Sequence, residues 1–420
     1  MKNSANFRLY ALLGTATVLY FFANFQRAGV PGTIFDQLQS TLGLSATAVS
    51  GLSSAFMYIY AFGQLIAGYN ADRFGGVRVI ACGGVLFAAG SLLFPFCDTL
   101  FGLYFSRALV GLGASAIYLS MVKEIARNFP GKFTLFLGTY LFIGYSGTIF
   151  ATVPLLQAVE ALGSWQLALK LAGAVILAVY IVYFLLKLTV PPIPIEKQSF
   201  NLMPFVKYYQ KRHNLLLSAY GALFFGIYYS LQIVAGQKYL TDFCQMSAMD
   251  AAAVLSGMGI LAAITNCLIA VLSRLCGNRR KIFILWAGYL GLGSLLILLV
   301  SAIFDWRSPY LAGCLLIFSV VANIAPITTS LAKETNRPEN LGVTVSTLNC
   351  LSYLAVAVLG NCCGMLLDVF EPSRQGEYLV YSRNSYLLLF AVLSAICVIP
   401  VVCSFFLKET RGQDCSETTF

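Results

Sequence analysis

Long stretches without charged residues constrain this chain more than any other feature of its sequence. Each can cross about 30 Å of hydrocarbon as a helix, and all are longer than the strands of a membrane barrel. We predict twelve membrane-spanning helices, at residues 9–35, 46–68, 79–97, 100–125, 133–157, 164–187, 214–237, 250–272, 282–303, 309–332, 341–367 and 384–407. Of the 420 residues, 59% are hydrophobic and 10% are charged, which excludes an ordinary soluble domain. The expected fold class is therefore an all-α membrane protein.

Basic residues gather in alternate connections between these stretches. Arg73, Arg127 and Arg274 lie on one side of the predicted membrane, whereas Asp36 and Asp98 lie in connections on the other side. The positive-inside rule then predicts a multi-pass protein of the cytoplasmic (inner) membrane with both termini in the cytoplasm. The net charge of +10 is spread over these connections. It therefore indicates contact with the lipid bilayer and no nucleic-acid partner.

The segment after the sixth stretch divides the chain. It contains Pro191, Pro192 and Pro194, followed by a basic stretch around Lys207 and Lys211, which is typical of a linker on an anionic membrane surface. Similar spacing in the two halves indicates an internal duplication that builds two pseudo-symmetric six-helix bundles. The predicted parts are an N-terminal bundle at 1–187, a cytoplasmic linker at 188–213, a C-terminal bundle at 214–407 and a cytoplasmic tail at 408–420.

A glycine-rich charged loop lies between the second and third stretches, with the sequence Gly68-Tyr-Asn-Ala-Asp72-Arg73-Phe-Gly75-Gly-Val-Arg78. Its glycines let two helix ends approach closely, and its charges can bridge neighbouring helices or cap a helix end. The loop resembles the signature G-x-x-x-D-R-x-G-x-(R/K)-(R/K) of the major facilitator superfamily, with one basic position replaced by valine. The resemblance implies the fold of that superfamily and a gating role for the loop.

Two further segments support this resemblance. Arg107 and Gly111 begin a stretch similar to the second superfamily signature, R-x-x-x-G-x-G-x-(A/S). The small residues permit close helix packing, and Arg107 either has a structural or coupling role or extends outward to the membrane surface. In the second half, Ser273-Arg274 to Arg279 repeats the loop with serine in place of its aspartate. We therefore expect no gating ion pair there.

Arg27 lies inside the first stretch, where an ionised side chain is costly and usually functional. Tyr20, Asn24 and Pro31 lie at helical spacings from it, so one face presents an aromatic ring, an amide and a guanidinium. A guanidinium suits a carboxylate or a phosphate, and we expect Arg27 to contact an anionic substrate. The structural alternatives are an arginine paired to backbone carbonyls, or one that extends outward to the membrane surface.

Other polar residues in the stretches are weaker candidates for substrate binding. Lys123 near the end of the fourth stretch could meet a departing anion, pair with a neighbouring acid or anchor the helix at the interface. The remaining candidates are amides and a hydroxyl that could equally form bonds between helices. They are Gln64, Tyr140, Gln232 and Asn323.

The first half resembles the anion:cation symporter branch of the superfamily, from Gln26-Arg27 to Ala67-Gly68. This resemblance implies that Arg27 contacts the substrate carboxylate, and it also places the branch's basic residue of the fourth span on Lys123. The branch often has an aspartate where this chain has Gln26, and a glutamate where it has Gly113-Ala114-Ser115. Only Glu124 and the loop residue Asp72 remain as acids within the predicted spans. Coupling to H⁺, coupling to Na⁺ and exchange for a counter-anion therefore stay open.

The expected function is a secondary active transporter, a symporter by resemblance, that moves a small organic anion of the carboxylate type by alternating access. The alternative is a proton-driven multidrug or metabolite exporter of the same superfamily. An enzyme is not expected, because the only histidine, His213, lies in the linker and no nucleophile-base set is present. The twelve cysteines lack metal-ligand spacing and fall mostly in apolar segments, as Cys82 and Cys267 do. We expect buried free thiols, no metal or other cofactor, and a monomer.

Overall fold

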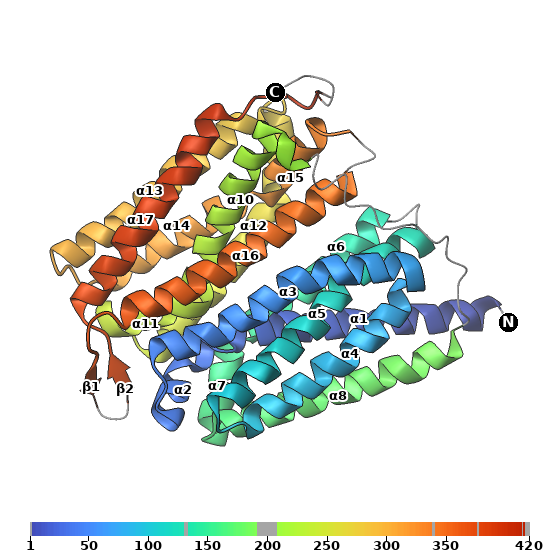
Figure 1. Cartoon of the computed structure of the whole chain (residues 1–420), viewed down its shortest axis with the longest axis horizontal. Helices are drawn as coiled ribbons and strands as arrows, with labels where there is room; N and C mark the ends of the chain where they lie inside the picture. The colour runs from blue at the N-terminus through green and yellow to red at the C-terminus, as the bar shows by residue number, and fades with distance from the viewer. Residues whose placement is uncertain are drawn as a thin grey trace. The chain divides into compact units, whose positions relative to one another are not determined.

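The computed structural model describes residues 2–129, 133–190, 208–337, 341–375, 378–413 and 415. Almost all of this described part is helical, and its two short strands form one hairpin (Figure 1). This confirms the all-α fold class. By their contacts the residues divide into two units: Met1–Gln37 with Ala55–Phe200, and Leu38–Ser54 with Asn201–Phe420. The predicted limits at 187, 213 and 407 stay a prediction.

The first unit consists of helices from the first half of the chain, with one helix shared. Helix α3 (Ala46–Phe74) begins in the second unit and continues into the first unit after Ser54. The other helices are α1 (Lys2–Gly29), η1 (Gly32–Ile34), α4 (Gly76–Leu93), η2 (Phe94–Phe96), α5 (Leu100–Asn128), α6 (Phe133–Phe150), α7 (Val153–Leu162) and α8 (Trp165–Thr189).

The second unit contains most of α2 (Phe35–Leu42), the start of α3 and all elements after the linker. Two short π-helical segments, η4 and η5, interrupt its first spanning helix. The elements are α10 (Arg212–Ser230), η4 (Leu231–Ala235), α11 (Gly236–Lys238), η5 (Tyr239–Phe243), α12 (Ala248–Leu275), α13 (Arg280–Ile303), η6 (Pro309–Leu311), α14 (Ala312–Ala322), α15 (Ala325–Glu334), α16 (Leu341–Leu367), β1 (Ser373–Gln375), β2 (Tyr378–Val380) and α17 (Arg383–Phe406).

Eleven helices of the described part are long and apolar enough to cross a membrane. A twelfth span arises if the pair Phe136–Phe150 and Val153–Leu162, bent by 43°, crosses once. Their positions match the twelve predicted stretches. The first and the seventh are longer than predicted. Phe7–Leu42 continues past residue 35 and includes Asp36, which was expected in a connection, and Arg212–Phe243 continues beyond residue 237 through the π-helical segment η5.

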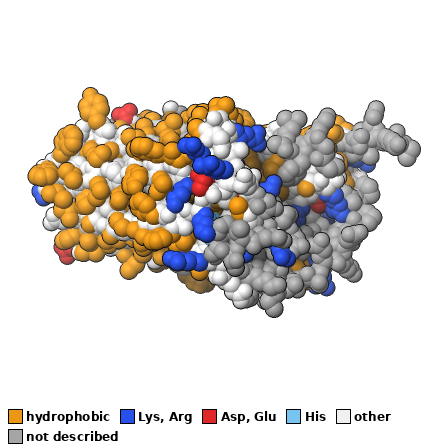
Figure 2. Space-filling view, turned by 90° about the horizontal axis from the view of Figure 1, so that it is seen from above, with side chains coloured by type: hydrophobic (Ala, Val, Ile, Leu, Met, Phe, Trp, Pro, Cys, Tyr) orange, Lys and Arg blue, Asp and Glu red, His pale blue; other side chains and the backbone are white. Residues whose placement is uncertain are grey.

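The surface of the protein carries the apolar side chains that such spans require. Phe101, Phe142 and Leu188 are each more than 60% exposed. Figure 2 shows hydrophobic side chains over much of the described part of one face, with lysine and arginine side chains gathered in one region. A soluble monomer rarely exposes apolar surface on this scale, so lipid is the solvent that suits it.

Small residues set the close packing of helices in the first unit. A Cβ atom at Gly113 would collide with the backbone of Phe87 and Gly83 on α4. A Cβ atom at Gly111 would lie 2.6 Å from the carbonyl oxygen of Phe56 on α3. Both glycines of the second signature therefore allow backbones to approach where a larger residue would separate them.

The cysteines are free thiols, but their burial differs from the prediction. Cys82 and Cys267 are exposed on the surface of the protein, whereas Cys314, Cys350 and Cys397 are buried. The two exposed thiols lie on outward-facing sides of their helices, which an apolar sequence context does not distinguish from buried sides. No group of histidine, cysteine and acidic residues in the described ranges could hold a metal ion.

Candidate functional site

Arg27 lies near the end of α1 and is 2% exposed. Its Nη2 donates a hydrogen bond of 2.6 Å to Oδ1 of Asn24, and Nδ2 of Asn24 donates to the backbone carbonyl of Tyr20 at 2.9 Å. The helical spacing read from the sequence therefore does place these three side chains on one buried face of α1. The partner of the guanidinium in this bond is a neutral amide oxygen, which orients the cation without adding a negative charge.

Aromatic rings surround the other end of this face. The ring of Tyr20 stacks between Tyr140 of α6, at 4.6 Å between ring centroids, and Tyr118 of α5, at 5.7 Å. Tyr145 meets the same ring edge-on at 6.1 Å. We call these four residues the tyrosine cluster. The hydroxyl of Tyr140 is buried and has no hydrogen-bond partner among the described residues, which is unusual for a buried polar group.

Arg107 of α5 holds the end of α1. It is 1% exposed, and its guanidinium donates to the backbone carbonyls of Gln26, at 3.1 Å, and Val30, at 2.7 Å. Helix α1 ends before Pro31, so carbonyls in its last turn lack their usual helical donors. The guanidinium also lies over the ring of Phe56 at 4.8 Å. The alternative in which Arg107 extends outward to the membrane surface is therefore wrong.

Two other candidates of the first unit lie away from the end of α1. Lys123 lies at the far end of α5, sixteen residues after Arg107 and thus about 24 Å along the helix. Its Nζ donates to the backbone carbonyl of Gly68 at 2.6 Å. Gln64 of α3 is buried, and its Nε2 has no hydrogen-bond partner in the described part of the chain.

The last two candidates, Gln232 and Asn323, belong to the second unit, and both lie where a spanning helix is irregular. Gln232 is in the π-helical segment η4, and its Nε2 donates to the carbonyl of Leu255 at 3.5 Å. Asn323 lies in the break between α14 and α15 and donates to the carbonyl of Ser319 at 2.8 Å. Irregular backbone at membrane depth is common where a cavity is lined. That Gln232 and Asn323 contact the same substrate as Arg27 stays a prediction.

The signature loop between α3 and α4 turns at Gly75, whose φ of 86° favours glycine. Gly68 lies in the last turns of α3 and is half-buried. Arg73 is exposed and donates to the hydroxyl of Tyr69 on its own helix at 3.4 Å, and Arg78 is also exposed. The side chain of Asp72 lies outside the described residues.

The cap of α4 comes from another helix. Oε1 of Glu124, on α5, accepts a hydrogen bond from the backbone N–H of Val77 at 3.3 Å and lies 3.7 Å from Arg127. Glu124 is 2% exposed, and a Cβ atom at Gly76 would collide with it. A carboxylate at a helix N-terminus is stabilising. Glu124 thus caps the start of α4 from a neighbouring helix.

An ion pair lies directly after the repeat of this loop in the second unit, and the expectation that the repeat has no gating ion pair stays a prediction. Arg280 donates to the hydroxyl of Ser273 at 2.6 Å, and its Nη2 lies 3.0 Å from Oε1 of Glu334. The acid comes from the end of α15, about sixty residues away, and therefore could not be recognised from the loop sequence.

The residues after α17 reinforce this pair. The carboxylate of Glu409 accepts from the backbone N–H groups of Arg280 and Lys281 at 2.8 and 2.9 Å, which caps α13. The hydroxyl of Thr410 donates to Oε2 of Glu334. The backbone N–H of Cys415 donates to the backbone carbonyl of Glu334 at 2.7 Å. The described part of the tail is therefore bonded to the second unit.

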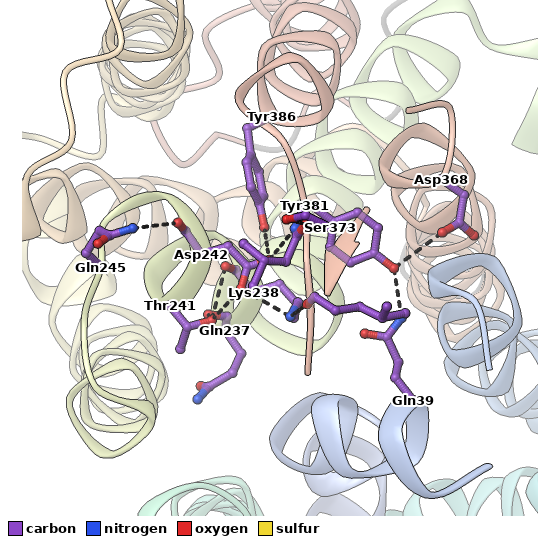
Figure 3. A network of polar contacts seen from close by, with 12 residues as sticks. Gln39, Gln237, Lys238, Thr241, Asp242, Gln245, Asp368, Ser373, Tyr381 and Tyr386 are labelled. Atoms are coloured by element: carbon purple, nitrogen blue, oxygen red, sulfur yellow. Dashed lines mark hydrogen bonds and ion pairs between the residues drawn. The ribbon is translucent and has the colours of Figure 1, made fainter. Parts of the chain in front are cut away.

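A further polar network was not found from the sequence. Nζ of Lys238 lies 3.1 Å from Oδ1 of Asp242, one helical turn later, and these side chains are 1% and 4% exposed. Oδ2 of Asp242 accepts from the N–H of Tyr381 at 2.9 Å and from the hydroxyl of Tyr386 at 3.0 Å (Figure 3). Asp242 was expected in a connection, and Glu124 and Asp72 were expected to be the only acids in the spans. Both expectations are wrong, because the helix continues to Phe243. The sequence did contain one signal for this pair: a lysine and an aspartate four residues apart within an apolar stretch, which is the spacing of an ion pair on one helix face.

These features define a class of protein: a polytopic helical membrane protein with cations buried inside its spans. The chain belongs to the Major Facilitator Superfamily, a family of transporters, whose model matches residues 16–361. The resemblance stated from the two signatures is thereby confirmed.

Relatives named as anion transporters share parts of the chain. The "Probable sulfoacetate transporter SauU" of Cupriavidus necator is 24% identical over 176 residues, 41% of this chain and 40% of that protein. "Probable anion transporter 3, chloroplastic" of Arabidopsis thaliana is 34% identical over 95 residues, 22% of this chain and 19% of that protein. "Monocarboxylate transporter 13" of Bos taurus is 28% identical over 144 residues, 34% of each chain. The matched stretches thus cover less than half of these relatives.

Solved structures match over nearly the whole chain. A bacterial homolog of the human lysosomal transporter Spinster has a TM-score of 0.73 at 18% identity, covering 95% of this chain and 96% of that one. The peptide transporter POT in complex with sulfate has a TM-score of 0.72 at 15% identity, covering 97% and 96%. At these identities the likeness establishes the fold.

Proposed function

We propose that this protein is a secondary active transporter that moves a small organic anion of the carboxylate type across the cytoplasmic membrane by alternating access. The observation that carries this proposal is the buried Arg27, held by Asn24 on the same face of α1 as Tyr20. An arginine side chain keeps its charge under physiological conditions, and its planar fork can bind a carboxylate or sulfonate through two hydrogen bonds.

The surroundings of Arg27 suit the recognition of an anion with an apolar body. Two helical turns separate Arg27 from Tyr20, about 10 Å along α1, and the tyrosine cluster supplies ring faces at that end. The buried hydroxyl of Tyr140 is available to donate a hydrogen bond to a ligand oxygen. Asn24, between the two ends, fixes the guanidinium in one orientation. We propose that Arg27, Asn24, Tyr20 and Tyr140 form the substrate contacts of the first unit.

The relatives support an anionic substrate. Their names refer to sulfoacetate, to anions and to monocarboxylates. The ligand class shared by the first and third names is a small organic molecule with a carboxylate, which matches the chemistry of a single guanidinium. Gln64, Lys123, Gln232 and Asn323 are proposed as further contacts, and both termini are proposed to be cytoplasmic because the basic connections lie on their side.

The test is uptake by the purified protein in proteoliposomes, with labelled mono- and dicarboxylates and sulfonates. Wild-type protein should take up at least one of them. Arg27→Gln should abolish that uptake, and Arg27→Lys should retain part of it because the charge remains. Arg8→Gln is the matched control, since Arg8 is on the same helix and exposed.

Normal uptake by Arg27→Gln at equal abundance would contradict the site. Absence of anion uptake, together with raised cellular tolerance to lipophilic cations, would instead support the exporter alternative.

A further inference from the structure

Helix α17 ends at Phe406, and two cations from neighbouring helices lie against its last two residues. Nζ of Lys281, in the first turn of α13, donates a hydrogen bond of 2.6 Å to the backbone carbonyl of Phe405. The guanidinium of Arg212, the first residue of α10, lies over the ring of Phe406 at 5.7 Å. We call Arg212, Lys281, Phe405 and Phe406 the α17 patch. All three helices belong to the second unit.

Both cations of the α17 patch are held by neutral groups. The last carbonyls of a helix lack helical donors, and the helix dipole places partial negative charge there, so the ammonium of Lys281 stabilises the end of α17. This bond uses one of the three donors of an ammonium. The contact of Arg212 with the face of a ring uses none of the N–H donors of its guanidinium. Each cation thus keeps donors for a further acceptor.

The acids close to this helix end are bonded to other groups. Glu409 follows α17 by three residues, and its carboxylate accepts from the backbone N–H groups of Arg280 and Lys281. The carboxylate of Glu334 pairs with the side chain of Arg280 at 3.0 Å. The described bonds of these two acids therefore cap α13 and hold Arg280, and they leave the side chains of Arg212 and Lys281 with their charges.

The apolar part of the α17 patch faces outward. Phe405 and Phe406 are 50% and 56% exposed, and the ring of Tyr289 on α13 meets the ring of Phe405 edge-on at 6.1 Å. Trp286 lies one helical turn before Tyr289 and is 61% exposed. Aromatic rings of this kind gather where a span meets the headgroup region of the bilayer. Two cations beside exposed rings suit a molecule that has an anionic head and an apolar tail.

We propose that the α17 patch is a binding site for an anionic glycerophospholipid. The phosphate of the lipid contacts the guanidinium of Arg212 and the ammonium of Lys281, both of which bind phosphate oxygens well. The acyl chains lie along the exposed rings of Phe405 and Tyr289, which a soluble phosphate would leave unused. No residue of the proposed substrate site takes part, so failure of this site would leave the proposed transport function untouched.

Trp286 provides an internal reporter for lipid at the α17 patch. It lies five residues after Lys281 on α13, about 7.5 Å along the helix, and the other tryptophans of the chain are Trp165 and Trp306. The test uses the full chain with Trp165→Phe and Trp306→Phe, reconstituted in phosphatidylcholine bilayers. Brominated acyl chains quench tryptophan fluorescence on contact. Small fractions of brominated phosphatidylglycerol or brominated phosphatidylcholine then report which lipid lies beside Trp286.

Phosphatidylglycerol should bind beside Trp286 about tenfold more tightly than phosphatidylcholine, because each interfacial cation adds to the attraction of an anionic lipid. Arg212→Gln/Lys281→Gln should remove this preference, whereas Arg212→Lys/Lys281→Arg should keep most of it because both charges remain. Arg274→Gln/Arg279→Gln is the matched control, since it removes two exposed cations of the same unit and should leave the preference unchanged. Quenching by brominated phosphatidylcholine should be the same in all variants, which separates a lost site from a misfolded protein.

A second reporter checks where the lipid binds. Protein that keeps Trp306 and carries Trp165→Phe and Trp286→Phe has its fluorophore beyond the other end of α13, a helix of 24 residues and thus about 36 Å long. This protein should show no preference for phosphatidylglycerol.

Three results would overturn the proposal: equal quenching of Trp286 by both lipids, an equal loss of preference in the two glutamine double variants, or the same preference at Trp306. Displacement of brominated phosphatidylglycerol by added inorganic phosphate would assign the patch to a soluble anion, and it would overturn the assignment to a lipid as well.

Discussion

The described bonds to five cations differ in kind between the two units. In the first unit, the buried Arg27 donates to an amide oxygen, the buried Arg107 to two backbone carbonyls and the half-buried Lys123 to one. In the second unit, Lys238 and Arg280 each lie within about 3 Å of a carboxylate. Neutral oxygens orient a cation and bring no negative charge, whereas a carboxylate cancels the charge of its partner.

This difference distinguishes a cation that can bind an anionic ligand from a cation that fastens one segment of the chain to another. A cation oriented by a neutral oxygen can attract an anionic ligand, and in the first unit Arg27 lies two helical turns from the ring of Tyr20 on the same face of α1. An ion pair between two helices instead holds two chain segments together, as Arg280 and Glu334 do at the start of α13. Lys238 and Asp242 pair within one helix. Substitutions at these residues test this distinction, and the substitution with the largest expected effect comes first.

Lys238 and Asp242 should behave as a buried ion pair. Lys238→Met leaves Asp242 buried without its cation and should lower the free energy of unfolding by about 3–5 kcal/mol. The double variant Lys238→Met/Asp242→Leu should recover most of that loss, because no isolated charge remains. Chemical denaturation in detergent measures both. Arg307→Met, in an exposed pair, is the control and should change stability little; equal losses in the single and double variants would contradict the pairing.

Asn24 should matter for ligand binding more than for stability. Asn24→Ala removes a hydrogen bond to a charged group, worth about 1.5–3 kcal/mol, so the guanidinium loses its fixed orientation. We expect the half-saturation concentration for the carried anion to rise roughly tenfold or more. Asn266→Ala is a matched control, because Asn266 also donates to the carbonyl four residues earlier. An equal rise in both variants would remove the orienting role.

Arg280 should matter for stability alone. Arg280→Gln leaves Glu334 with Thr410 as its donor and without its cation, and should lower the free energy of unfolding by about 1–2 kcal/mol. The affinity for the anion should stay unchanged. The neighbouring Arg279 is exposed, so Arg279→Gln should have no measurable effect in the same denaturation experiment. A loss of affinity in Arg280→Gln would mean that this cation takes part in recognition.

Tyr140 gives the smallest expected change. Its hydroxyl is buried with no partner among the described residues, so Tyr140→Phe should leave stability unchanged or raise it by up to about 1 kcal/mol. If the hydroxyl contacts the ligand, ligand-induced thermal stabilisation should fall at the same time. Unchanged stabilisation by every bound anion would assign Tyr140 to packing with Tyr20 alone.

The spans could be predicted because hydrocarbon imposes a minimum length on an apolar helix. The row of Tyr20, Asn24 and Arg27 could also be predicted, because helical spacing alone brings these side chains to one face. Tyr118 was missed, since nothing local links it to Tyr20. Stacking across helices depends on the packing of α5 and α1, which a single sequence does not encode in any short pattern.

The bond between Gln39 and Tyr381 could not have been predicted for a related reason. Gln39 and Tyr381 are separated by more than 340 positions, and their bond exists only after both halves have folded. The seventh spanning helix also continues to Phe243, past its expected end at residue 237, and its last part is the π-helical segment η5. Lys238 and Asp242 therefore lie within this helix, although apolar periodicity alone ended the span at residue 237.

The bonds made by the described tail have a practical consequence for handling the protein. Truncation after Phe406, or an affinity tag fused there, would remove the cap of Glu409 on α13 and the donor that Thr410 gives to Glu334. Such a product would unfold more readily during detergent extraction, and the loss could be mistaken for an intrinsic fragility of the transporter. Purification handles and fluorescent fusions are best attached beyond Cys415, where these bonds are kept.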